Sequence, residues 1–178
     1  MIRILSLYGS PHVSGNTAEL HNVLLKNLSH DENIDYQTFS MDFKPCDGCG
    51  NCDENLTCRY HDLDDFYNYL RIADIIILSS PIYFTSLPST LKKIIDRCQL
   101  FWNLKKHGRV INRKTGYVIM TAGSDYENAF NPSLIVIRHF FNTINCNFDS
   151  CNVFLCAGLD NCFDNYNKII KDIMRIGK

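Results

Sequence analysis

The sequence lacks several features that mark large classes of protein. No apolar run approaches the roughly 20 residues that span a bilayer, and no basic segment, apolar core and cleavage site of a secretory signal comes first. The formal net charge is only −1, which gives no reason to expect nucleic acid or a membrane as a partner. Internal repeats, low-complexity tracts and linkers are also missing. We therefore expect one cytoplasmic domain over residues 1–178, long enough for a substantial core.

The first loop lacks the two common nucleotide-binding patterns. An apolar run at 2–8 leads into Gly, Ser and Pro residues, and a helical pattern follows at 17–28. The loop matches neither G-x-G-x-x-G nor G-x-x-x-x-G-K-[ST], and it contains no lysine that could reach a β- or γ-phosphate. The start of a helix offers unpaired N–H groups to an anion, so a terminal monophosphate held by neutral donors fits best. The alternative is an ordinary turn whose Ser and Asn side chains cap the helix.

Strand-like and helix-like segments alternate along the rest of the chain. Apolar runs predict strands over 2–8, 34–39, 75–78, 117–120 and 148–156. Helical patterns lie between them, over 17–28, from 62, from 88, over 132–144 and over 161–176. This alternation predicts an α/β fold in which helices cover both faces of a five-stranded parallel sheet of order 2-1-3-4-5. The loops after the first, third and fourth strands would then meet at one edge of the sheet.

Two of these loops have the composition of a flavin slot. The loop at 79–88 is rich in Ser, Pro and aromatic residues, and the loop at 121–125 has small residues that let the backbone face a ring. A flavin needs a flat apolar slot and a few amides at its ring nitrogens and oxygens, because these contacts tune its electronics. The alternative for Tyr83 and Phe84 is ordinary core packing.

Cysteine is abundant, with nine residues, and four of them lie in one short segment. The spacing Cys46-x2-Cys49-x2-Cys52-x5-Cys58, with glycines that allow tight curvature, suits convergence of four thiols within an insertion at about 43–60. Three thiols at this spacing can bind three corners of an iron–sulfur cubane. Four thiolates also suit a structural zinc site, and free thiols are the third possibility. The other five have no ligand spacing and are expected to be buried free thiols: Cys98, Cys146, Cys151, Cys156 and Cys162.

Three other features have a functional and a structural interpretation. Asp96 and Arg97 can form an intermolecular or helix-capping ion pair, or a solvated surface pair. The basic run at 105–114 can attract a nicotinamide 2′-phosphate, but a solvated loop is the simpler interpretation. Phe101 and Trp102 can cover a flavin, although a core or subunit-interface role is favoured.

The loops together resemble a known family. Ser10-Pro11-x-x-Ser14-Gly15-Asn16-Thr17, Ser80-Pro81-Ile82-Tyr83 and Leu91-Lys92-x-x-x-Asp96-Arg97 resemble the NAD(P)H-dependent FMN reductase branch of the flavodoxin-like superfamily. The cysteine spacing resembles that of its iron–sulfur flavoprotein subgroup, which carries a [4Fe–4S] cluster on such cysteines. The resemblance covers roughly the first 125 residues and implies a flavodoxin-like three-layer sandwich.

The resemblance also implies a cofactor and its ligands. The FMN phosphate would lie on Ser10, Ser14, Gly15, Asn16 and Thr17, and the ring would lie between two groups of residues: Pro81, Ile82, Tyr83 and Phe84 on one side, and Thr121, Ala122 and Gly123 on the other. His12 replaces an arginine found in many relatives, and it would either contact the phosphate or face solvent.

The implied activity is that of an FMN-dependent oxidoreductase. It would accept hydride from NAD(P)H and pass electrons to a small-molecule or protein acceptor, through a [4Fe–4S] cluster if one is present. Catalysis would belong to the flavin, so no side chain is expected to act as acid, base or nucleophile. Two alternatives remain open at this point: a non-enzymatic FMN/iron–sulfur electron carrier, and a zinc-stapled flavin-binding module. Relatives in this branch form dimers or tetramers, so the resemblance implies a homodimer or homotetramer.

Overall fold

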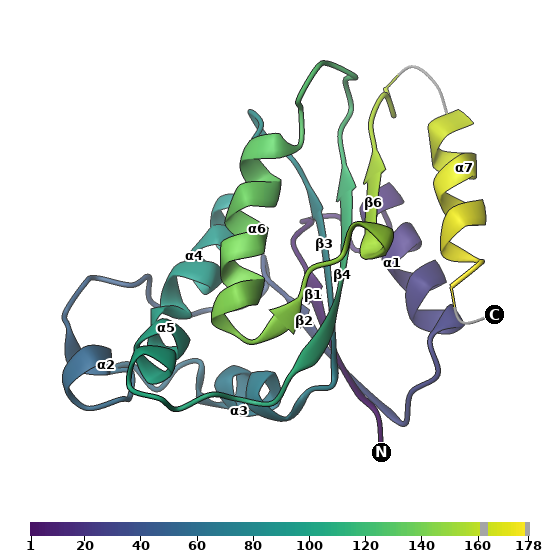
Figure 1. The fold of residues 1–178 in the computed structure, drawn as a ribbon. Helices are drawn as coiled ribbons and strands as arrows, with labels where there is room; N and C mark the ends of the chain where they lie inside the picture. Colours follow the sequence, from purple (N-terminus) through teal and green to yellow (C-terminus); the bar gives the residue numbers. More distant parts are fainter. Residues whose placement is uncertain (161–163, 177–178) are drawn as a thin grey trace.

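The computed structural model describes residues 1–160 and 164–176. Helices follow strands along most of the chain (Figure 1). The elements in order are β1 (Arg3–Tyr8), α1 (Asn16–Asn27), β2 (Glu32–Gln37), α2 (Asn51–Glu54), α3 (Asp64–Ile72), β3 (Ile75–Pro81), α4 (Ser89–Arg97), α5 (Gln99–Lys106), β4 (Lys114–Thr121), α6 (Asn131–Thr143), β5 (Cys146–Asn147), the 3₁₀ turn η1 (Ser150–Asn152), β6 (Val153–Cys156) and α7 (Asp164–Ile173).

The sheet has the expected strand order. All described pairs are parallel, and the path runs β2-β1-β3-β4-β5. Leu5 of β1 lies between Ile34 of β2 and Ile76 of β3 in the register. The continuous apolar run of β3 is buried on both faces, as in a central parallel strand. The predicted order 2-1-3-4-5 is therefore confirmed.

The fifth strand differs from its prediction. The expected strand at 148–156 is divided into β5 and β6, and both pair with β4. On β4, the residue paired with β5 (Thr115) and the first residue paired with β6 (Val118) are three positions apart. Their partners, Asn147 and Val153, are six positions apart, and the extra residues between them form η1. Asp149, Ser150 and Asn152 occupy three of the five intervening positions and favour a turn, and Asp and Asn are also depleted in strands.

Two apolar cores lie on opposite faces of the sheet. Figure 1 shows α3, α4, α5 and α6 on one side and α1 with α7 on the other. The larger core joins residues of α3 to α6 to the sheet, including Phe66, Leu91 and Phe141. The smaller core joins Leu20 and Leu24 of α1 to β4, β6 and α7. Three layers result, as expected for this class. None of the described helices has the length and apolar character that a membrane span requires.

One predicted helix begins later than expected, and another begins where expected but is divided in two. The helix expected from Asp62 begins at Asp64, and its N-cap position is Leu63, which makes no side-chain cap. The Asp62 carboxylate instead accepts hydrogen bonds from the Lys44 N–H and the Arg97 guanidinium. The helix expected from 88 is interrupted at Cys98, so α4 and α5 are separate helices.

Gly116 in β4 is the position where the packing is least tolerant of an added carbon. A Cβ there would lie within 3 Å of the Phe141 ring and of the Asn147 carbonyl oxygen. We expect Gly116→Ala to lower the free energy of unfolding by about 1–3 kcal/mol, because the ring cannot withdraw from a close-packed core. Urea denaturation followed by circular dichroism measures this change. An unchanged midpoint would show that Phe141 repacks without cost.

Candidate functional site

A cavity of about 350 Å³ lies at the carboxyl edge of the sheet. The loops after β1, β3 and β4 meet there, as the strand order requires. Eleven predicted cofactor residues line it, together with Leu159 and Asp160: Ser10, His12, Gly15, Asn16, Thr17, Pro81, Ile82, Tyr83, Thr121, Ala122 and Gly123. Predicted residues from three distant parts of the chain are thus brought together.

The first loop is held close to β3 by its backbone. The Gly9 N–H donates to the Ser79 carbonyl at 2.7 Å, and a Cβ on Gly9 would lie 2.8 Å from Leu91. The Ser10 hydroxyl accepts a hydrogen bond from the His12 N–H at 3.1 Å. The loop then enters α1 at Asn16, whose first N–H groups have no intrahelical acceptor. The local structure therefore suits an anion at the start of a helix.

Two predicted residues of this loop lie away from its centre. Ser14 is exposed and does not line the cavity. His12 lines the cavity but is exposed to solvent. His12 is thus exposed to solvent at the edge of the cavity, and a contact between His12 and a phosphate stays a prediction.

A buried hydrogen bond joins the first loop to the third. The Thr17 and Thr121 hydroxyl oxygens are 2.6 Å apart, and both residues are almost fully buried. Because Thr17 lies at the start of α1 and Thr121 at the end of β4, this bond fixes the separation of two cavity walls.

The second loop forms a strained turn beside the cavity. Tyr83 and Ser86 exchange two backbone hydrogen bonds, and the residues between them have positive φ, 50° at Phe84 and 63° at Thr85. Residues other than glycine rarely adopt positive φ, and backbone strain of this kind clusters at functional sites. The Ser133 hydroxyl on α6 holds the turn by donating to the Thr85 carbonyl at 3.0 Å. Phe84 is consequently fully exposed rather than packed in the core.

A second, wider cavity of about 500 Å³ adjoins the first. It shares Ile82, Tyr83, Ala122, Gly123 and Asp160 with the first cavity and adds Phe84, Ser124 and Tyr126. Tyr83 and Tyr126 are each 45% exposed, so aromatic rings border an open entrance. A planar ligand held in the first cavity would thus have a second planar molecule within reach.

Sequence reasoning missed the loop after β6. Leu159 and Asp160 line the first cavity, and their N–H groups donate to the Ala122 and Gly123 carbonyls at 3.2 and 3.0 Å. A Cβ on Gly123 would lie 2.3 Å from the Asp160 carboxylate. The predicted strand order could have identified this loop, because the loop after a fifth parallel strand lies at the same edge of the sheet as the other loops.

The four cysteines surround a separate cavity of about 240 Å³. Cys46, Cys49, Cys52 and Cys58 all line it, and Gly48 and Gly50 have positive φ values of 69° and 79°. The loop thus curves as the glycines predicted. Within residues 1–160 and 164–176, no three or more His, Cys, Asp or Glu side chains converge closely enough to hold a single metal ion. The cavity that the four cysteines help to line is larger than a single ion requires.

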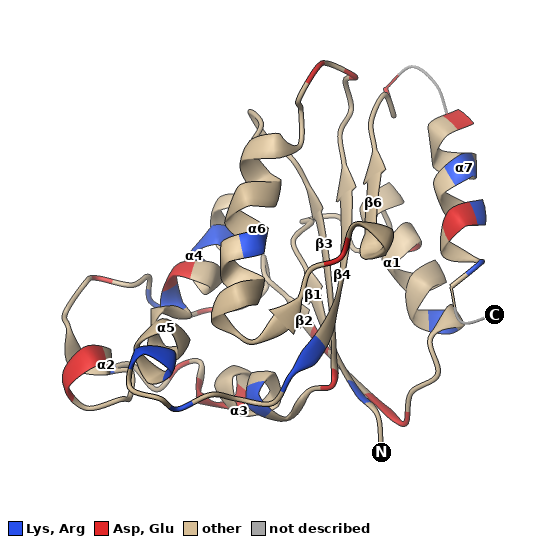
Figure 2. Ribbon diagram, viewed as in Figure 1, with Lys and Arg blue, Asp and Glu red and all other residues tan. Residues whose placement is uncertain are grey.

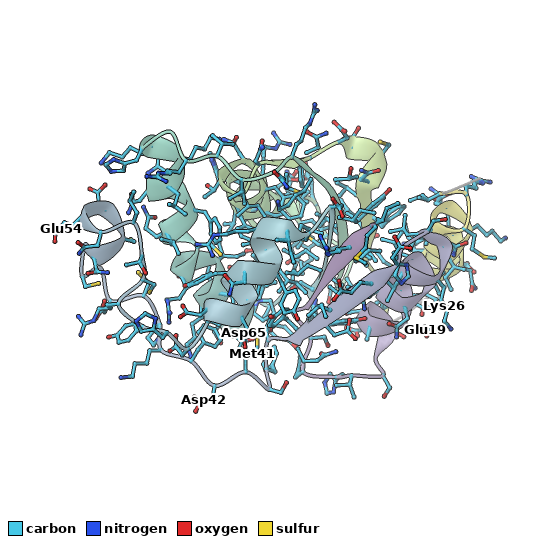
Figure 3. The ribbon with its side chains drawn as sticks, turned by 90° about the horizontal axis from the view of Figure 1, so that it is seen from below. Glu19, Lys26, Met41, Asp42, Glu54 and Asp65 are labelled. Atoms are coloured by element: carbon cyan, nitrogen blue, oxygen red, sulfur yellow. The ribbon has the colours of Figure 1, made fainter. Side chains whose placement is uncertain are left out.

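Helix α5 supports the cysteine loop from one side. The Asn103 amide donates to Cys52 Sγ at 3.0 Å, and Lys106 Nζ contacts the Asp53 carboxylate at 3.0 Å. Burial raises the pKa of the Cys52 thiol, and the Asn103 hydrogen bond opposes that shift. Figure 2 shows the acidic α2 beside the basic end of α5. In the view from below, Glu54 of α2 lies at the opposite end of the molecule from Glu19 and Lys26 of α1 (Figure 3).

Several lysines of the basic run at 105–114 already form hydrogen bonds within the chain. Lys105 donates to Asn142, and Lys106 to Asp53. Lys114 is buried rather than part of a solvated loop, and it donates to the Arg71 and Asn112 carbonyls. Burial lowers the pKa of Lys114.

Some predictions for the remaining cysteines, Arg97 and Trp102 are confirmed and others are wrong. Cys98, Cys146 and Cys156 are buried thiols as expected, Cys151 is exposed, and Cys162 lies outside the described residues. Arg97 does not pair with Asp96, which instead contacts Lys92 at 2.6 Å. Trp102 is 50% exposed and lies in a shallow groove between α5 and α6, so it is not a core residue.

Known proteins share both the sequence pattern and the fold. Residues 2–140 match the NADPH-dependent FMN reductase family. An iron–sulfur flavoprotein of Methanocaldococcus jannaschii is 33% identical over 144 residues, which cover 79% of this chain and 72% of that protein. An iron–sulfur flavoprotein of Methanosarcina thermophila is 27% identical over 127 residues, which cover 69% of this chain and 64% of that one.

Solved structures agree on the architecture. An NAD(P)H:quinone oxidoreductase from Methanothermobacter marburgensis superposes with a TM-score of 0.74 at 13% identity, covering 99% of this chain and 93% of that one. An azoreductase from Bacillus anthracis superposes with a TM-score of 0.69 at 12% identity, covering 99% and 97%. These likenesses establish the flavodoxin-like fold, and the family match implies a nicotinamide donor. The chain belongs to the NADPH-dependent FMN reductase family of oxidoreductases.

Proposed function

We propose that this protein is an FMN-dependent oxidoreductase that takes hydride from NAD(P)H and passes electrons to a small-molecule or protein acceptor. The observation that carries the proposal is the cavity at the carboxyl edge of the sheet, which collects the predicted residues of three loops. Its lining suits FMN, since it combines the neutral donors and helix start of the first loop with apolar residues of the other loops.

Different residues would bind the phosphate and the ring of FMN. Ser10, Asn16 and Thr17 would hold the phosphate with hydroxyl, amide and backbone N–H donors. Ile82, Tyr83, Ala122 and Gly123 would flank the ring and exclude water from its faces. Bound FMN supplies hydride acceptance and one-electron or two-electron transfer. The adjoining cavity, bordered by Tyr83 and Tyr126, would admit the nicotinamide or an aromatic acceptor.

We further propose that the four cysteines hold a [4Fe–4S] cluster. A tetrahedral zinc site draws its sulfurs to about 2.3 Å from one ion, and the described cysteines do not converge in this way. Four thiols around a cavity of about 240 Å³ suit a larger group. The Asn103 hydrogen bond to Cys52 Sγ also suits a cluster, because hydrogen bonds to ligand sulfurs help to set its potential.

Anaerobic purification tests both proposals together. We expect a visible spectrum with flavin bands and broad cluster absorbance, and about four irons and four sulfides per chain. NADH or NADPH should then bleach the flavin bands. Flavin without iron would overturn the cluster alone, and zinc in place of iron would point to a structural site. Flavin that neither nicotinamide reduces would overturn the reductase and favour an electron carrier.

The bond between Thr17 and Thr121 offers a test of the flavin site. We expect Thr17→Val to weaken FMN binding by about tenfold or more, because a phosphate donor is lost and the Thr121 hydroxyl is left unpaired. Fluorescence titration of the flavin-free protein with FMN measures the affinity. Thr143→Val, at the C-terminal end of α6 and outside this cavity, is the matched control and should leave the affinity unchanged. Equal affinities for Thr17→Val and wild type would contradict this site.

A further inference from the structure

Arg97, at the end of α4, is an almost fully buried arginine. Only 2% of the residue is exposed, although arginine is seldom buried so completely unless it is paired. Its guanidinium donates at 2.5 Å to the Lys44 carbonyl, at 3.2 Å to the Tyr60 carbonyl and at 2.7 Å to the Asp62 carboxylate. The guanidinium also lies over the Tyr60 ring, 5.3 Å from its centroid.

These acceptors lie on both sides of the cysteine segment. Lys44 comes two residues before Cys46, and Tyr60 comes two residues after Cys58. The two ends of the segment also meet directly, since the Lys44 N–H donates to the Asp62 carboxylate at 2.8 Å. One side chain from α4 therefore ties together the start and the end of the loop that carries all four thiols.

The position of Arg97 also gives the cysteine cavity a positive charge. Arg97 lines that cavity with the four cysteines, and its Nε is buried without a hydrogen-bond partner among the described residues. Burial acts to lower the pKa of Arg97, but the hydrogen bond to Asp62 and nearby charges raise it above its usual value, so the side chain stays charged. A fixed cation beside thiolates or a reduced cluster stabilises their negative charge.

We propose that Arg97 is the positioning residue of the four-cysteine site: it closes the loop by holding both ends and supplies a positive charge to the cavity. The inference rests on the proposed cluster for its electronic part only. The closure of the loop is a property of the chain itself. A buried ion pair contributes little to stability compared with apolar packing, so a role in fixing one loop conformation accounts for its presence.

Hydrogen exchange of the protein, with and without iron, tests the closure. In the iron-free protein we expect Arg97→Met to speed exchange of the 44–62 backbone by about tenfold or more, because three charge-assisted hydrogen bonds are lost. The exchange rate of Arg97→Lys should lie between those of Arg97→Met and wild type. A single ammonium cannot reach three acceptors at once, as the planar guanidinium of arginine does. Lys92→Met, which removes an exposed ion pair from the same helix, is the control and should not change this exchange. Equal exchange in Arg97→Met and wild type would overturn the proposal.

The reduction potential of the bound cluster tests the charge. We expect it to be more negative in Arg97→Met than in Arg97→Lys, because only the lysine variant retains a cation beside the added electron. Equal potentials in these two variants would overturn the electronic role. If the circular dichroism spectrum shows that Arg97→Met fails to fold, Asp62→Asn is measured in its place, and faster exchange at 44–62 is again the expected result. If wild type holds no iron, the proposed cluster fails, while the exchange experiment still decides the closure.

Discussion

Cys49→Ser is expected to lose its iron and to keep its flavin. Four thiols line the cysteine cavity, and a [4Fe–4S] cluster needs all four as ligands. The hydroxyl of serine is a harder and far less acidic ligand than a thiol, so the variant should hold little or none of the iron that we propose for wild type. Iron and acid-labile sulfide analysis after anaerobic purification measures the loss.

The flavin should be unaffected because the two cavities are built from different residues. Among the described residues, no side chain lines both the cysteine cavity and the cavity at the carboxyl edge of the sheet. Flavin content per chain should therefore equal that of wild type. Cys151→Ser is the matched control, since Cys151 is exposed and lies outside the cysteine segment, and this variant should retain its iron. Wild-type iron content in Cys49→Ser would contradict the assignment of the cluster to these thiols.

The sequence predicted the parts of this molecule that depend on local pattern. The apolar run at Ile75–Leu78 identified a central parallel strand, and the Gly, Ser and Pro residues after three strands identified the loops that meet at one edge. The cysteine spacing, with Gly48 and Gly50, predicted the tight curvature of that segment. These features are visible because their physical cause lies within a few residues of the chain.

Features that depend on distant contacts could not be predicted in this way. Arg97 follows Asp96 on a helix, so the local pattern suggested an ion pair of these two neighbours, yet the acceptors of Arg97 lie 35 to 53 residues away. Asp62, where a helix was expected to begin, lies before α3 and accepts a hydrogen bond from Arg97 instead. Asp160 lines the cavity at the carboxyl edge of the sheet only because the loop after β6 returns to Gly123. Each of these depends on tertiary packing rather than on periodicity or spacing.

A steep loss of stability in acid is the second large effect that we expect, and its source is His21. This side chain on α1 is fully buried and stacks on Tyr8, with ring centroids 3.9 Å apart. Its Nδ1 lies 2.8 Å from the Ser79 hydroxyl, and its Nε2 has no hydrogen-bond partner among the described residues. Burial lowers the pKa of His21 from 6.5 to about 3, because a charged imidazolium would be desolvated there.

The sign of the pH dependence follows from proton binding in the two states. In the unfolded chain His21 binds a proton below a pH of about 6.5, whereas in the folded protein it stays neutral down to about pH 3. Between these values the unfolded state binds more protons, so stability falls as the pH falls. The loss from this residue approaches about 1.4 kcal/mol per pH unit and is absent above neutral pH.

Comparing wild type with His21→Gln isolates this contribution, because both proteins carry the same carboxylates. We expect the variant to be less stable at pH 7, where it loses the stacked ring, and to lose less stability between pH 6 and 4. Urea denaturation at several pH values gives the slopes, and His30→Gln, at an exposed position, should follow wild type. Parallel curves for wild type and His21→Gln would rule out His21 as the source. Saturating FMN should raise the stability of both proteins at every pH through its binding energy. The difference between their pH slopes should stay unchanged, because His21 does not line the proposed FMN cavity.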